Sequence, residues 1–376
     1  MYVAFKIIFV NIFSLFFIIT MVSVFSGCAA AGPDYSPPEV PLSSTWHTQP
    51  GKGLSAEEMN QQLQSSWWTT FNDALLSSLI DRAVAGNLDM KKAQSRVRQA
   101  YASRGVTEAK LFPNLNVSGS DTWTRSTVDT GGDRTSQRFS TNFDSSWEMD
   151  IFGGVRRSLE AADADLQARQ ENLRDVLVSL VAEVALNYIE VRTYQVRLAA
   201  VNENLAAQNE TYQLILWRNQ AGLSDELAVQ QARYNLENTR SEIPSLHTGL
   251  EGAMNRIAVL LGEQPGKLHQ ELEKNGVIPA CPEQITVGVP ADMIRRRPDV
   301  RQAERELASQ TAKVGVAAAE LYPKFSLGGS IGIDAVSLNR LASGLTTPDN
   351  WVLSGGPRAS WAIFDARGTS GYYIIT

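Results

Sequence analysis

Hydrophobic residues follow two periods along this chain, one of two residues and one of seven. After Pro113, apolar residues occupy odd positions and the even positions are polar as far as Thr124. Alternation of this kind is typical of a β-strand with one apolar and one polar face. It returns in three further segments, residues 139–151, 325–334 and 351–363. We therefore predict four strands, and Pro357 inside the last one indicates a bulge or an edge strand.

The length of these segments adds to the pattern. Each is about ten residues or a little longer, as in a strand that crosses an outer membrane with lipid on one side and water on the other. A half-buried sheet in a soluble domain would show the same alternation. The N-terminal segment described below favours the membrane.

The seven-residue period occupies the middle of the chain. From Val155 to Asn219 there is no proline and no glycine, and leucine recurs at every seventh position, at Leu159, Leu166, Leu173 and Leu180. This repeat predicts a helix that packs in a left-handed supercoil with its neighbours. At about 1.5 Å per residue, the helix would extend on the order of 100 Å.

We predict that the long helix then reverses. Gly222 suits its C-terminal cap, and Ser224 suits the N-cap of the following helix. The return helix, Asp225–Leu261, has apolar residues at the same spacing, and Pro244 predicts a kink or a restart within it. This helix is much shorter than its partner.

An internal repeat contains a further helix that could make up the difference in length between the return helix and the long helix. Residues Asn87–Ser120 align without a gap with Arg297–Ser330, and each segment passes from a helical pattern through a proline to a strand. We interpret them as copies of one duplicated unit. The helix Asp89–Phe112 of the first copy is expected to stack end to end on the return helix.

These patterns divide the chain into five regions. We predict a lipoprotein signal peptide (residues 1–27), an acylated, proline-rich extended tether (28–66), a first repeat (67–270), a linker (271–296) and a second repeat (297–376).

The N-terminus predicts a lipid anchor. Lys6 precedes a long apolar run, and Ser26 and Gly27 lead to Cys28 as in the bacterial lipobox. An uncleaved membrane-spanning helix is the alternative. Because Ala29 stands where an aspartate would retain a lipoprotein at the inner membrane, the outer membrane is the expected location. If Cys28 carries lipid, Cys281 has no partner for an intrachain disulfide.

Charge and motifs argue against other classes of protein. The net charge of −6 is unlike that of a nucleic-acid-binding protein. Gly131–Thr135 lacks the lysine of a phosphate-binding loop, and there is no HExxH or GxSxG motif. The three histidines, His47, His247 and His269, lack ligand spacing. We therefore predict no enzyme activity, cofactor or metal site.

Five motifs resemble those of one family. They are Trp67–Asp73, Leu111–Pro113, Trp147–Gly153, Leu260–Gly262 followed by Pro265 and Gly266, and Arg296–Val300. Together they resemble the TolC/OprM family of outer-membrane efflux channels, in the lipoprotein (NodT-like) branch that serves RND-type tripartite systems. The resemblance covers nearly everything after Cys28.

The resemblance implies a mixed fold, a membrane β-barrel continued by a long α-helical coiled-coil barrel. A homotrimer would form twelve strands, four from each chain. It implies a passive conduit for drugs, metals or other small molecules, joined to a periplasmic adaptor and an inner-membrane RND pump. Gly222, Leu223 and Ser224 correspond to the tip that contacts the adaptor. Four strands alone cannot close a barrel, and open strand edges are not tolerated in lipid, so oligomerisation is also expected on physical grounds.

Two further expectations concern alternatives and completeness. A periplasmic coiled-coil structural lipoprotein or adaptor is the alternative function, with the four alternating strands as evidence against it. Family members continue from the fourth strand into a second helical hairpin, whereas Ala366–Thr376 do not resemble one. We therefore expect a C-terminally truncated chain that forms no stable trimer and gives no drug resistance.

Overall fold

The computed structural model describes residues 30–39, 41, 46–47, 54–55, 66–128, 132–274, 276–281, 285–286, 290–344 and 350–364. The predicted signal peptide, Cys28 and the tail Ala366–Thr376 lie outside these residues.

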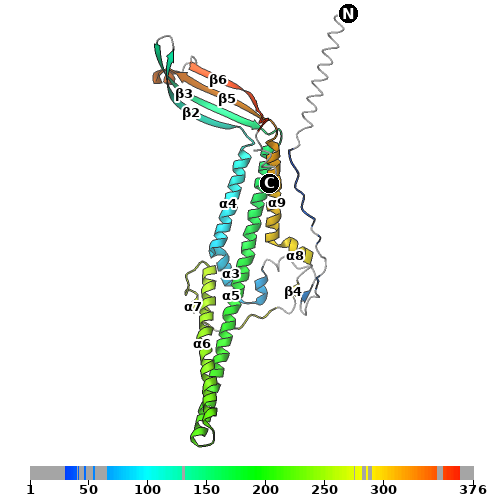
Figure 1. The fold of residues 1–376 in the computed structure, drawn as a ribbon, viewed down its shortest axis with the longest axis vertical. Coiled ribbons are helices and arrows are strands. Elements are labelled where there is room, and N and C mark those ends of the chain that lie inside the picture. The colour runs from blue at the N-terminus through cyan, green and yellow to red at the C-terminus, as the bar shows by residue number, and fades with distance from the viewer. Residues whose placement is uncertain are drawn as a thin grey trace. The chain divides into compact units, whose positions relative to one another are not determined.

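The described chain contains long helices and one larger sheet (Figure 1). The elements are β1 (Leu54–Ser55), η1 (Trp67–Phe71), α3 (Ala74–Gly86), α4 (Leu88–Ala109), β2 (Asn114–Val128), β3 (Gly132–Met149), α5 (Gly154–Gln220), α6 (Glu226–Leu260), α7 (His269–Leu272), β4 (Ile285–Thr286), α8 (Pro290–Arg296), α9 (Pro298–Ala319), β5 (Lys324–Ala335), α10 (Leu338–Gly344) and β6 (Trp351–Ser360). They form two compact bodies. Body A contains the described residues up to Pro38, Arg98–Ala168 and those from Ala303 onward, and body B contains the described residues of Glu39–Val97 and Arg169–Gln302.

The sheet of body A is antiparallel and has the strand order β2-β3-β5-β6. Its strands correspond to the four that the alternating pattern predicted. β6 lies at an edge, where the missing N–H of Pro357 is tolerated. The edge position predicted for this strand is therefore confirmed. The short strands β1 and β4 pair in parallel in body B.

Helix α5 begins and ends within one residue of its predicted limits. Its first turn is capped by Asp150, whose carboxylate accepts hydrogen bonds from the backbone N–H groups of Val155 (3.0 Å) and Arg156 (2.9 Å). The helix then continues for 67 residues, because no proline interrupts it and its only glycine is the first residue. Helix α6 likewise continues through Pro244. Of the two predicted alternatives at this proline, a kink or a restart, the restart is wrong.

In body B, α4 begins where α6 ends. The side chain of Asn87 caps α4 by accepting from Met90 N (3.0 Å) and donates to the carbonyl oxygen of Leu260, the last residue of α6 (2.9 Å). Gly262 follows with a φ of 72°, and a methyl group added there would lie 2.6 Å from Gly86 O. The end-to-end stacking predicted for these helices is confirmed at this junction.

The two copies of the predicted repeat have matching limits. Leu88 and Ala109, the ends of α4, align with Pro298 and Ala319, the ends of α9, and the two strands that follow also begin at aligned positions. We call α4 with β2 the first helix–strand unit and α9 with β5 the second. Each unit accepts a hydrogen bond from a tryptophan outside it. The indole of Trp147 in β3 donates to Leu111 O (3.0 Å), and the indole of Trp361 after β6 donates to Leu321 O (3.1 Å), in both cases at the leucine between helix and strand.

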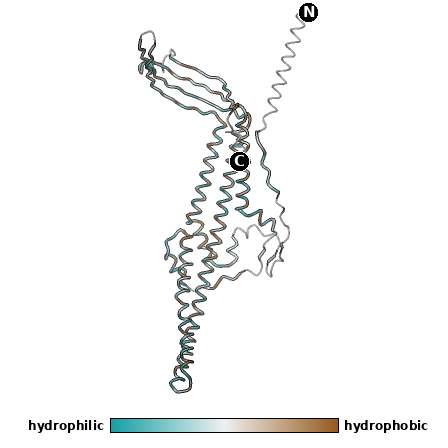
Figure 2. Tube along the Cα trace, viewed as in Figure 1, coloured by the Kyte–Doolittle hydropathy of each residue, from teal (hydrophilic) through white to brown (hydrophobic). Residues whose placement is uncertain are grey.

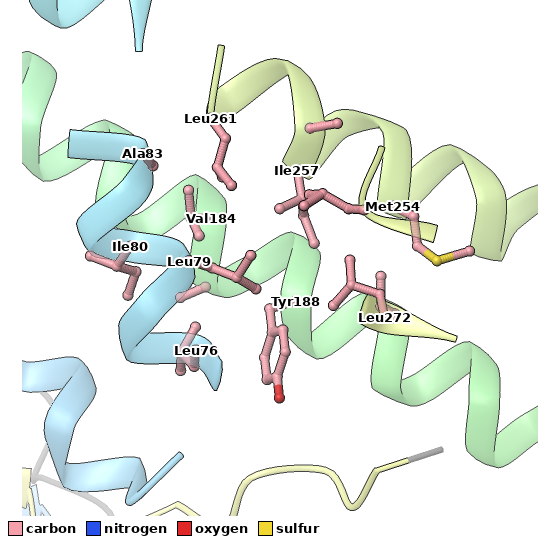
Figure 3. Packing of buried hydrophobic residues seen from close by; sticks show 14 of the residues in the cluster. Leu76, Leu79, Ile80, Ala83, Val184, Tyr188, Met254, Ile257, Leu261 and Leu272 are labelled. Atoms are coloured by element: carbon pink, nitrogen blue, oxygen red, sulfur yellow. The ribbon is translucent and has the colours of Figure 1, made fainter. Parts of the chain in front are cut away.

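A hydrophobic core holds body B together (Figure 3). Leu76 and Leu79 of α3 pack with Tyr188 of α5, Ile257 of α6 and Leu272 of α7, and all five are 1% exposed or less. Burial of such a side chain contributes roughly 1.5–3 kcal/mol. This cluster fixes the middle of α5 against α3, α6 and α7.

Candidate functional site

The sheet presents one apolar face. Val117 lies opposite Phe143, Phe143 opposite Ile331, and Ile331 opposite Leu353, so that one apolar row crosses all four strands. Partners in register project to the same side of a sheet. All four side chains are exposed, from 40% for Ile331 to 81% for Leu353. An apolar surface of this extent indicates contact with a membrane or another protein.

The opposite face is polar. Ser118 donates to the carboxylate of Asp144 (2.7 Å), and the hydroxyl groups of Ser120 and Ser140 are 2.8 Å apart. These cross-strand contacts alternate along β2 and β3 with the apolar positions, as Figure 2 shows by the mixture of hydrophobic and hydrophilic positions along the strands. The face therefore suits contact with water.

Both ends of the sheet are open. β2 pairs with β3 and β6 pairs with β5, so in the described chain each outer strand has one unpaired edge. Unpaired backbone N–H and C=O groups favour the addition of a further strand. In lipid, where each such group would cost several kcal/mol, they need a partner.

The predicted site residues Gly222, Leu223 and Ser224 lie in the turn between α5 and α6. Gly222 has a φ of 71°. Its N–H donates to Asn219 O (2.9 Å), and that of Leu223 donates to Arg218 O (2.8 Å), a Schellman cap. The predicted C-cap is confirmed.

The start of α6 differs from the prediction. Its N-cap is Asp225, whose carboxylate accepts from Ala228 N (2.8 Å), so the assignment of Ser224 to this position is wrong. A carboxylate competes well for this role beside the positive end of the helix dipole. The backbone oxygen of Ser224 instead accepts from Asn219 Nδ2 (2.9 Å), and Leu223 is 73% exposed at the turn.

A buried polar cluster in body B was not predicted. Tyr188 donates its hydroxyl to Asp73 (2.6 Å), the N-cap residue of α3, and Arg192 donates to the Tyr188 oxygen from Nε and Nη2 (3.2 Å each). Arg192 is 5% exposed and also donates to Lys274 O (2.7 Å). Burial, together with the hydrogen bond to Asp73, raises the pKa of Tyr188 to about 12. The cluster connects α3, α5 and the segment after α7.

Metal ligands and membrane-spanning helices are two further features relevant to function. Within the described ranges, no group of three or more His, Cys, Asp or Glu side chains is placed to hold a metal ion. Among the described residues, no helix has both the length and the apolar character needed to cross a membrane. Cys281 is an exposed free thiol, whereas Cys28 is outside the described part of the chain.

A two-faced, four-stranded sheet joined to helices of this length defines the class of TolC-like outer-membrane channels. The chain belongs to the outer membrane efflux protein family, which matches residues 79–263 and 289–372. The predicted family, fold class and outer-membrane location are thereby confirmed.

Individual relatives agree. Nodulation protein T of Rhizobium leguminosarum bv. trifolii is 35% identical over 348 residues, covering 91% of this chain and 71% of the relative. The cation efflux system protein CusC of Escherichia coli O6:H1 is 30% identical over 341 residues, covering 91% and 72%. The solved structure of the outer-membrane channel OprN has a TM-score of 0.84 and 34% identity, covering 92% of this chain and 76% of that structure.

Proposed function

We propose that this protein is a subunit of a homotrimeric outer-membrane channel that conducts drugs, metals or other small molecules passively from the periplasm to the outside. The carrying observation is the sheet, in which apolar and polar rows alternate in register across all four strands. The apolar face would contact lipid, and the polar face would line the water-filled lumen.

Closure of the barrel would require further copies of the chain. Both outer strands of the described sheet have an open edge, and a three-fold arrangement would pair β6 of one copy with β2 of the next. Every backbone group within the membrane would then have a partner. Twelve strands would result from three copies of four.

The hairpin of α5 and α6 would connect the channel to its partners, a periplasmic adaptor and an inner-membrane RND pump that supplies the energy. The exposed turn at Gly222, Leu223 and Ser224 is the proposed contact. A cysteine placed at Leu223 in a Cys281→Ser background should cross-link to the adaptor. Capture of the adaptor from a cysteine near Trp147 but not from position 223 would reverse the orientation.

Cys28 is the proposed site of lipid attachment, on the evidence of the residues that precede it. Intact-mass analysis of the mature chain should show a diacylated or triacylated N-terminal cysteine. An unmodified cysteine or a retained signal segment would contradict this assignment.

The orientation of the sheet provides the direct test of the channel. Ile331→Cys and Ser330→Cys place thiols on opposite faces of the inner strand β5, in a Cys281→Ser parent. In outer-membrane vesicles, a water-soluble maleimide should modify position 330 and spare position 331. Equal modification of both by the water-soluble reagent would favour the alternative, a periplasmic structural lipoprotein or adaptor.

Oligomeric state and conductance in lipid bilayers answer a separate question. The tail Ala366–Thr376 falls outside the described part of the chain. A stable trimer with measurable conductance would support the homotrimeric channel, and the lack of both would contradict it.

A further inference from the structure

The segment shortly after Cys28 packs against the helices of body A. We call residues Ala30–Pro38 the strap. The N–H of Ala31 donates to the carbonyl oxygen of Phe152 (2.9 Å), at the corner where β3 passes into α5. Tyr35 donates to Glu304 of α9 (3.5 Å), and its ring centre lies 5.6 Å from the guanidinium carbon of Arg305. The strap therefore contacts both α9 and the corner before α5, within body A.

Arg157 fastens the strap from the first turn of α5. The residue is 5% exposed. Its guanidinium donates to Ala31 O (3.1 Å), Gly32 O (3.3 Å) and the carboxylate of Asp34 (2.6 Å), and also to Glu160 (2.8 Å). A buried guanidinium is costly unless its donors are satisfied. Three of these four acceptors belong to the strap, so Arg157 loses most of its partners when the strap leaves.

Two glycines meet where the strap crosses α9. Gly32 has a φ of 85°, and a methyl group added to it would collide with Gly315 Cα. A methyl group added to Gly315 would lie 2.9 Å from Ala31 O and from Arg157 Cδ. A side chain is therefore excluded at Gly32 by its positive φ and its contact with α9, and at Gly315 by the strap and Arg157. The backbones approach closely enough for Arg157 to reach the strap carbonyls.

The strap packs beside a row of small residues between α5 and α9. Ala161 and Ala164 of α5 and Ala308 and Ala312 of α9 are all buried, and Ser309 Oγ donates to Ala161 O (3.0 Å). Small side chains permit close helix packing, and the strap covers one end of the row. The surface that contacts the strap is therefore formed by both helices.

We infer that α5 and α9 form a peptide-binding groove whose ligand is the protein's own strap. Arg157 holds the strap by hydrogen bonds, and the Gly32–Gly315 contact allows the two backbones to approach closely. A docked strap joins the second helix–strand unit to α5. The docked strap also limits how far a lipid anchor at Cys28 can lie from it, because the two residues from Cys28 to Ala30 can span at most about 7 Å. This last consequence rests on the proposed lipid attachment, whereas docking itself does not.

The duplicated sequence supplies a matched control. Gly105 occupies in α4 the position that Gly315 occupies in α9 when the two copies are aligned, and a methyl group added to Gly105 would meet nothing within 4 Å. Gly105→Ala and Gly315→Ala are thus the same change at equivalent helix positions. They differ in whether the strap lies against them.

Docking can be measured in the full chain. Chymotryptic cleavage after Tyr35 and hydrogen exchange at the Ala31 amide would be followed by mass spectrometry. Gly32→Ala should accelerate both at least about tenfold, because alanine is strained at positive φ and its methyl group collides with α9. Gly315→Ala should do the same, and Gly105→Ala should leave both rates at the parent value.

Further variants separate docking from folding and from lipidation. Gly32 lies outside every described helix and strand, so Gly32→Ala leaves their sequences unchanged. Arg157→Lys keeps the charge but loses the forked donors, and it should also release the strap. The same rates in a Cys28→Ser background should match the parent, because docking needs no lipid. Unchanged rates in Gly32→Ala, or equal acceleration in Gly105→Ala, would overturn the inference.

Discussion

The first and second helix–strand units begin at aligned positions of the repeat, but their surroundings differ. Gly105 of α4 faces open space, whereas Gly315 of α9 is covered by the strap. β2 is an edge strand and β5 is an inner strand. Asn87, just before α4, is buried, whereas its equivalent Arg297 is exposed. The two units thus share a backbone pattern but differ in the contacts they make.

The largest expected effect tests whether both strands face lipid. Val117 and Leu327 are equivalent apolar positions of β2 and β5. Leu327→Lys should lower the free energy of unfolding by about 2–4 kcal/mol if the position lies near the membrane centre. Val117→Lys should lower it by a similar amount if a neighbouring copy covers the β2 edge. Urea unfolding in lipid vesicles would measure both. Ser330→Lys, on the polar face of β5, is the control and should be tolerated.

Alkaline pH tests the polar cluster of body B. Because Tyr188 has a pKa of about 12 in the folded protein and about 10 when unfolded, the folded state holds the proton more tightly. The stabilisation is complete below pH 10 and is lost as pH rises toward 12, by up to about 3 kcal/mol. Urea midpoints between pH 9 and 12 should fall, and they should fall less in Tyr188→Phe. Equal slopes would contradict the raised pKa of Tyr188 in the folded protein.

A smaller difference in stability is expected between substitutions at the N-termini of α4 and α9. Asn87→Ala removes the cap of α4 and the hydrogen bond to Leu260, and should cost about 2 kcal/mol. Arg297→Ala removes an exposed ion pair with Asp299 and should cause no measurable change. Denaturant unfolding of both variants would measure the difference. Equal losses would show that the two starts are packed alike.

The smallest effect concerns Trp147 and Trp361, whose indoles donate to the leucine carbonyls between helix and strand. Trp147→Phe should cost about 1 kcal/mol through loss of the hydrogen bond to Leu111 O. Trp361→Phe should cost less, because Trp361 is 58% exposed in the chain and water can replace it as the donor to Leu321 O. Thermal unfolding would rank the two. A greater loss at Trp361 would indicate that another copy of the chain buries it.

The elements that sequence predicted well are governed by local patterns. The limits of α5 follow from the absence of glycine and proline between Val155 and Asn219, and the four strands follow from the alternation of apolar and polar residues. The turn at Gly222 follows from its left-handed backbone. Local patterns also misled at Ser224, because a serine and an aspartate stood side by side and only the three-dimensional turn selects between them.

Other features depend on residues distant in sequence. Arg157 and Arg192 both occur within a helix rich in charged residues, and nothing nearby distinguishes them from their exposed neighbours. Their burial depends on segments that arrive from elsewhere, the strap for Arg157 and the chain after α7 for Arg192. Gly32 likewise resembles an ordinary glycine of a proline-rich tether until α9 is placed beside it.

The unbroken course of α5 also constrains how this gene can change. Each residue turns a helix by about 100°, so the insertion or loss of one codon would rotate every later side chain of α5 away from its partners. Seven codons would restore the orientation to within about 20°. Over 67 residues, natural length variation is therefore expected in steps of seven, whereas the turn at Gly222 can absorb single additions.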